Sequence, residues 1–317
     1  MTDMVTQPPG VAHRPPVSAR ANLTEGRGAL TGGSPPPTMA PVSAASLPYT
    51  VLVLLVELAV GGLAMVTVFD ARRQVTAGYV KAAALTVLPL AVLAGWTYLV
   101  LGSANDIQGY TLAARWLRPF GIVLAAFLVV TAAHTTAAML DRHDLEVRLG
   151  AAGSALGLVA LVLLAALLGG PAWSGAGMLL SLFAGTAVLG SALMSMLWGH
   201  WYLTSGRLPK EPMEQMSLVL LAAIAMQIVS VVLGIVIAPR EVPTGGAFGI
   251  ALSANPAFWL RIAVGLVFPL VVTALAWKAA TIRGMMSATG LLYIALGLLL
   301  AGEVLARGLL FTTGAAV

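Results

Sequence analysis

Long apolar runs, repeated between residues 48 and 311, constrain this chain more than any other feature of its sequence. A helix needs about 20 apolar residues to cross the hydrocarbon core of a bilayer, and each run reaches that length. Only 9% of the residues are charged, whereas soluble domains average roughly 25%. We therefore expect an all-α polytopic membrane protein, a bundle of about eight transmembrane helices. The predicted helices cover residues 48–70, 79–101, 116–140, 149–169, 175–203, 214–238, 257–281 and 285–311.

The chain before the first apolar run has a different composition. Residues 1–47 are rich in Pro, Gly, Ser and Thr and contain few bulky apolar side chains. Such a segment cannot bury a core, so we expect a disordered N-terminal tail. It also lacks the apolar stretch of a signal peptide. The predicted domains are the tail at 1–47, the transmembrane domain at 48–311 and a short C-terminal tail at 312–317.

Basic residues indicate the orientation in the membrane, because Lys and Arg collect in cytoplasmic loops. The odd-numbered loops of the predicted bundle carry more of them than the even-numbered loops. We therefore expect a multi-pass protein of the bacterial cytoplasmic membrane with both termini outside. The loop residues behind this prediction are Arg72, Arg73, Arg142, Arg148, Arg207, Lys210 and Arg283, against Arg115, Arg118 and Arg240.

Two counts exclude whole classes of function. The chain has no Cys, which excludes disulfides, zinc sites built on thiolates and cysteine-ligated iron–sulfur clusters. Its net charge of +5 comes from basic residues dispersed at helix ends, whereas nucleic-acid-binding proteins concentrate them in a patch. We expect no nucleic-acid partner and no metal site in the chain itself.

A few charged residues lie inside the predicted spans, where each costs roughly 3 kcal/mol near the bilayer centre. Glu57 lies in the first span, Arg261 near the start of the seventh, and Glu303 and Arg307 in the eighth. Glu303 and Arg307 are four residues apart, so they share a helix face and can pair. In the predicted topology all four lie toward the outer half of the membrane. They form either a proton-linked pocket or a structural ion pair accompanied by unrelated charges.

Two histidines in the spans are further candidates. His134 lies in the third predicted span, two turns before the cytoplasmic boundary of the membrane. His200 lies near the same boundary in the fifth span, within the aromatic cluster WGHWY. Histidine at such a place can carry a proton, donate a hydrogen bond to a quinone carbonyl or ligate a b-type haem. Both can equally be interfacial or interhelical residues that bond to backbone or water.

Uncharged polar and aromatic residues give weaker signals. Trp96 and Tyr98 in the second span could line a cavity, as could Gln227 in the sixth. Single polar residues in membrane bundles often hold neighbouring helices together instead.

The end of the chain resembles a known family. The segment GEVLARGLLF at 302–311 is similar to the last helix of the membrane anchor subunits of bacterial molybdenum–iron–sulfur oxidoreductases, the dimethyl-sulphoxide-reductase-type and NrfD-like anchors. Their last helix often ends in a Gly-Glu-x-x-x-Arg-x-x-Phe pattern. Glu57, followed by Gly61 and Gly62, is similar to the acidic first helix of the NrfD-like group. Eight spans with both termini outside also match the dimethyl-sulphoxide-reductase type.

The resemblance implies a quinone-interacting subunit without a catalytic centre of its own. Such a subunit binds menaquinone or ubiquinone and exchanges electrons with an iron–sulfur subunit, which serves a separate catalytic oxidoreductase subunit. Glu57 and Glu303 would be proton acceptors or structural acids near the quinone, and Arg307 would keep Glu303 ionised. The alternatives are a small-solute or ion transporter, a b-type haem protein that uses His134 and His200, and a structural subunit that contacts only lipid and neighbouring proteins.

Overall fold

A computed structural model describes residues 46–101, 106–107, 110–169, 175–205, 208–236 and 252–317. Within these residues, eight helical spans are long and apolar enough to cross a membrane. The prediction of an all-α, multi-pass membrane protein is therefore confirmed. Residues 1–45 of the predicted tail lie outside the described residues, as do Arg207 and Arg240 of the predicted loops.

The spans follow the predicted apolar runs closely. Their helices are α1 (Leu47–Ala71), α2 (Ala77–Leu101), α3 (Leu117–Met139), α4 (His143–Leu168), α5 (Gly175–Ser205) and α6 (Glu211–Val236), then α7 (Pro256–Ile262) continued by η3 (Ala263–Val267) and α8 (Phe268–Thr281), and finally α9 (Met285–Thr313). Short 3-10 turns, η1 (Ala114–Trp116) and η2 (Leu252–Ala254), precede α3 and α7. A two-residue antiparallel ribbon, β1 (Asp106–Ile107) with β2 (Tyr110–Thr111), follows α2.

The largest difference from the predicted boundaries is at the start of α4. The apolar pattern predicts a start at residue 149, but the helix begins at His143. Asp144 and Glu146 lie in its first turn, where acidic side chains are stabilised by the positive end of the helix dipole. A boundary drawn from hydropathy alone excludes this charged turn and was therefore wrong by six residues.

The seventh span also differs from a regular helix. It contains a π-helical segment, η3, between α7 and α8. Pro269 lies just after this segment and has no backbone N–H to donate to the carbonyl of Gly265, four residues earlier. A proline-linked break of this kind explains why the hydrogen-bond pattern changes here.

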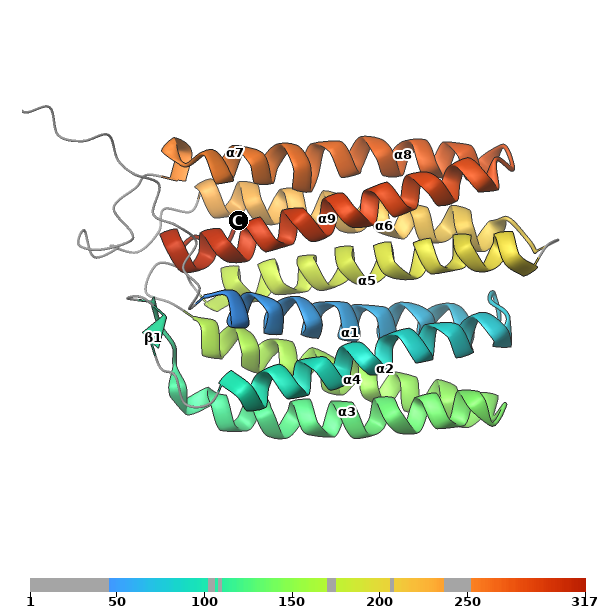
Figure 1. The fold of residues 1–317 in the computed structure, drawn as a ribbon, viewed down its shortest axis with the longest axis horizontal. Helices are drawn as coiled ribbons and strands as arrows, with labels where there is room; N and C mark the ends of the chain where they lie inside the picture. Colours follow the sequence, from blue (N-terminus) through green and yellow to red (C-terminus); the bar gives the residue numbers. More distant parts are fainter. Residues whose placement is uncertain (1–45, 102–105, 108–109, 170–174, 206–207, 237–251) are drawn as a thin grey trace, which may run out of the picture. The chain divides into compact units, whose positions relative to one another are not determined.

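The helices form one bundle in which α1 and α5 are the most deeply buried spans. Figure 1 shows α1 and α5 side by side, with α2, α3 and α4 on one side of them and α6, α8 and α9 on the other. Gly61 and Gly190 lie where α1 crosses α5, and a Cβ atom on Gly61 would lie only 2.1 Å from the carbonyl oxygen of Thr186. Gly61, the first glycine after Glu57, therefore allows α1 and α5 to approach closely, as expected of small residues in membrane bundles.

The predicted C-terminal tail, residues 312–317, begins as the end of a helix and packs against the bundle. Helix α9 continues to Thr313, and Gly314 adopts the left-handed conformation that ends a helix. Val317 is buried against Val231, Phe258 and neighbouring apolar residues. The last four residues therefore belong to the bundle.

Candidate functional site

Four charged side chains that the sequence singles out meet inside the bundle. Glu57 comes from α1, Arg261 from α7, and Glu303 and Arg307 from α9. The guanidinium of Arg261 lies 2.9 Å from Glu303 Oε1, and that of Arg307 lies 3.1 Å from Glu303 Oε2 and also pairs with Glu57 Oε1. None of the four is more than 1% exposed. We refer to Glu57, Arg261, Glu303 and Arg307 together as the buried charge network.

Two uncharged side chains extend this network to further helices. Gln227 on α6 donates a hydrogen bond from Nε2 to Glu303 Oε1. Ser181 on α5 accepts one at Oγ from Arg307 Nη1, at 3.1 Å. Gln227 therefore links α6 to α9, which is the interhelical role that the sequence suggested as the alternative to lining a cavity. Ser181 was missed, because a single serine in an apolar run gives no distinctive sequence signal. Five helices are connected through these contacts.

Glycines make room for the charged groups. A Cβ atom on Gly185 of α5 would lie 2.6 Å from Glu57 Oε1 and 2.7 Å from Arg307 Nη2. Gly265 of η3 and Gly302 of α9 are in close contact, because a Cβ atom on Gly302 would lie 2.3 Å from the Gly265 Cα. Their small size brings α7 and α9 close enough for Arg261 to reach Glu303.

The irregular η3 segment supplies a further contact. Arg261 Nη1 donates a hydrogen bond to the carbonyl oxygen of Gly265, at 3.3 Å. In a regular α-helix that carbonyl would accept from the N–H of residue 269, which in this chain is a proline. The guanidinium therefore binds an acceptor that the helix break leaves available.

The charges of the network balance, but not all of its polar atoms are paired. Two glutamates face two arginines, which is the condition under which buried charges are tolerated. Among the described residues, Glu57 Oε2 and Gln227 Oε1 have no hydrogen-bond partner. Both are buried acceptors that can accept a hydrogen bond, and the Glu57 carboxylate oxygen can also take up a proton.

The structure gives the two histidines different surroundings. His134 on α3 is buried, and its Nδ1 donates to the carbonyl of Glu146 on α4, at 3.0 Å. His200 on α5 is exposed, and its Nδ1 lies 3.1 Å from the hydroxyl of Tyr293 on α9. Helix α3 packs against α2 and α4, whereas α5 packs mainly against α1, α6 and α9. Neither histidine contacts the buried charge network through any hydrogen bond described.

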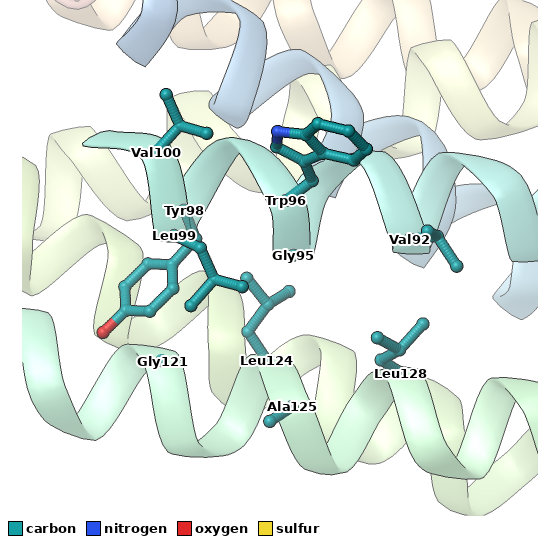
Figure 2. A pocket seen from close by; sticks show the side chains of 10 residues that line it. All are labelled: Val92, Gly95, Trp96, Tyr98, Leu99, Val100, Gly121, Leu124, Ala125 and Leu128. Atoms are coloured by element: carbon teal, nitrogen blue, oxygen red, sulfur yellow. The ribbon is translucent and has the colours of Figure 1, made fainter. Parts of the chain in front are cut away.

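An apolar groove opens between α2 and α3, and no residue of the buried charge network lines it (Figure 2). Trp96 and Tyr98 line it, as the sequence suggests, in a cavity of about 490 Å³. The Tyr98 hydroxyl donates to the carbonyl of Leu117 at 3.2 Å, and the other lining side chains are almost all apolar. The groove therefore suits a hydrocarbon chain, such as a lipid acyl chain, better than a polar headgroup.

Comparison with known proteins adds no family to these observations. No protein-family model matches the chain, and no curated protein matches it.

Proposed function

We propose that this protein is an integral membrane subunit of a respiratory oxidoreductase complex that binds quinone or quinol beside the buried charge network. In this proposal it exchanges electrons with a partner iron–sulfur subunit. The partner would hold the cluster, because this chain has no cysteine to ligate one. Menaquinone and ubiquinone both have the required chemistry.

The observation that carries the proposal is the convergence of Glu57, Glu303, Arg261 and Arg307 within the bundle. Ionisable groups inside a membrane are costly and mark ion pathways, proton relays or ligand sites. Quinol oxidation releases protons, and the unpaired Glu57 Oε2 is an acceptor for one. The resemblance of GEVLARGLLF to the last helix of quinone-linked anchors supports the same function, because two of the four residues lie in that motif.

Quinone content provides the first test. The chain is purified in mild detergent, and bound quinone is extracted and quantified against an unrelated eight-span protein prepared from the same membranes. We expect about one quinone per chain, in line with ligand sites being few per protein. Quinone at the level of the unrelated protein would contradict the proposal. A reduced-minus-oxidised absorption spectrum of the same sample tests the b-type haem alternative.

Ion or solute transport is a second candidate, and η3 favours it. Broken helices commonly line the substrate sites of transporters near the bilayer midplane, and η3 lies beside Arg261. Liposomes that contain the chain and a pH-sensitive dye distinguish the two. A proton flux driven by an ion or solute gradient, abolished in Glu57→Gln, would favour transport over quinone binding.

A further inference from the structure

We propose that Asp70, His143 and Glu146 bind a divalent transition-metal ion where α1 meets α4. One ligand atom from each residue lies within 4.8 Å of the others. These residues take no part in the buried charge network. The proposal departs from the expectation, drawn from the sequence, that the chain holds no metal site. That expectation rested on the absence of cysteine, which does not bear on a site made of histidine and carboxylates.

The two helices hold the three side chains on facing turns. Asp70 lies in the last turn of α1, while His143 and Glu146 lie in the first turn of α4. A spacing of three residues places His143 and Glu146 on the same face of α4. Helices α1 and α4 pack directly against each other, so this face is directed to the end of α1.

A buried carboxylate oxygen of Asp70 faces the other two candidate ligands. Asp70 is 5% exposed, and its Oδ2 has no hydrogen-bond partner among the residues described. The same atom lies 3.5 Å from His143 Nδ1, so it faces the other candidate ligands. Glu146 is also buried, at 6% exposure. The contact with His143 balances the charge of Asp70 only when the imidazole is protonated. A cation bound between the three side chains would interact directly with this oxygen, which lacks a hydrogen bond.

The spacing and the donor set suit a transition metal. Ligand atoms about 2.1 Å from a tetrahedral ion are about 3.4 Å apart, close to the 3.5 Å between Asp70 Oδ2 and His143 Nδ1. One imidazole and two carboxylates suit Zn²⁺, Mn²⁺ or Fe²⁺. A cavity of about 320 Å³ borders all three residues. Water or another small ligand could therefore complete the coordination, as in sites with three protein ligands.

The charges around the cavity leave a net attraction for a cation. Asp141 also borders the cavity, but it pairs with Lys81 at 2.7 Å. Arg73 lines the same cavity, and its positive charge competes with a metal ion for the two carboxylates. Bound metal would tie the end of α1 to the start of α4.

Titration of the full chain tests this proposal. The protein is purified without a histidine tag, treated with a chelator and titrated with Zn²⁺ against a chromophoric chelator. We expect about one ion per chain and a rise in the thermal unfolding midpoint, because metal binding stabilises the folded state. Zn²⁺ affinity should fall at least about tenfold, the usual effect of changes around metal ligands, in each of the variants His143→Ala, Asp70→Asn and Glu146→Gln.

Matched controls separate this site from general binding. Asp144→Asn alters an exposed acid in the same turn of α4, and His13→Ala removes a histidine of the N-terminal segment. Both should bind Zn²⁺ as the wild type does. Unchanged Zn²⁺ affinity in both His143→Ala and Asp70→Asn would overturn the proposal. So would a wild-type chain that shows no Zn²⁺-dependent rise in the unfolding midpoint.

Discussion

Glu303 accepts hydrogen bonds from side chains on three helices: Gln227 of α6, Arg261 of α7 and Arg307 of its own helix. An acid that accepts from this many donors is fixed in position. Arg261 contacts the rest of the network through its ion pair with Glu303. Glu57, in the contacts described, pairs with Arg307 alone. Glu57, with one unpaired oxygen, is the better candidate to exchange a proton.

Arg261→Ala should destabilise the protein strongly. The change leaves the buried Glu303 with one cation fewer, and removing one partner of a buried ion pair costs about 3–5 kcal/mol. The measurement is the midpoint of thermal unfolding in detergent. In the double variant Arg261→Ala/Glu303→Gln the loss should be smaller than the sum of the single losses, because the unpaired charge has been removed.

An ion pair at the edge of the bundle provides the control for Arg261→Ala. Lys210 lies 2.7 Å from Glu214, and both are partly exposed. Lys210→Ala should cost less than about 2 kcal/mol, because an ion pair in contact with water contributes at most about 1 kcal/mol. The hydrogen bond from Lys210 to the Thr281 carbonyl contributes about 1 kcal/mol more. Equal losses for Arg261→Ala and Lys210→Ala would show that burial does not strengthen the network.

At the scale of the helices, Gly185 decides how closely α5 approaches the charges. Gly185→Ala should destabilise the protein by about 1–3 kcal/mol, because its Cβ would overlap Glu57 and Arg307 and displace their ion pair. Gly290→Ala is a matched control, since a Cβ on Gly290 of α9 would meet nothing within 4 Å. There the better helix propensity of alanine should raise stability by up to about 1 kcal/mol. A neutral Gly185→Ala variant would contradict the packing described.

The elements show which features can be predicted from the sequence. Each span was found because a bilayer requires a long apolar run, and the contact of Glu303 with Arg307 follows from their spacing on one helix. The joining of Arg261 to Glu303 depends on the crossing of two helices at Gly265 and Gly302, which no local pattern encodes. The first turn of α4 was missed because its charged residues end the apolar pattern although the helix continues.

The orientation of the whole molecule can be tested with single cysteines, since the chain has none of its own. Leu47 and Ile282 are exposed residues at opposite ends of the bundle, and they lie at the start of α1 and just after α8. If the termini are outside, a membrane-impermeant maleimide should label Leu47→Cys in spheroplasts. Ile282→Cys should react only after the membrane is opened. The reverse pattern would invert the predicted topology.

Across the bundle, the charge network connects α1, α5, α6, α7 and α9, while the candidate metal site joins α1 to α4 through different residues. Loss of metal binding should therefore leave quinone binding intact. His143→Ala should retain the quinone content of the wild type, measured by extraction from purified protein. Loss of both metal binding and quinone binding in His143→Ala would show that the two sites are coupled through α1.

The most direct test of the proposed function is the affinity of the purified chain, in nanodiscs, for a short-chain quinone analogue, compared between the wild type and Glu303→Gln. We expect saturable binding to the wild type and at least about tenfold weaker binding to Glu303→Gln, since a hydrogen bond to a charged group contributes about 1.5–3 kcal/mol. Glu214→Gln makes the same change in a partly exposed ion pair and should bind like the wild type. Equal affinity in Glu303→Gln, or no saturable binding to the wild type, would contradict a quinone site at the buried charge network.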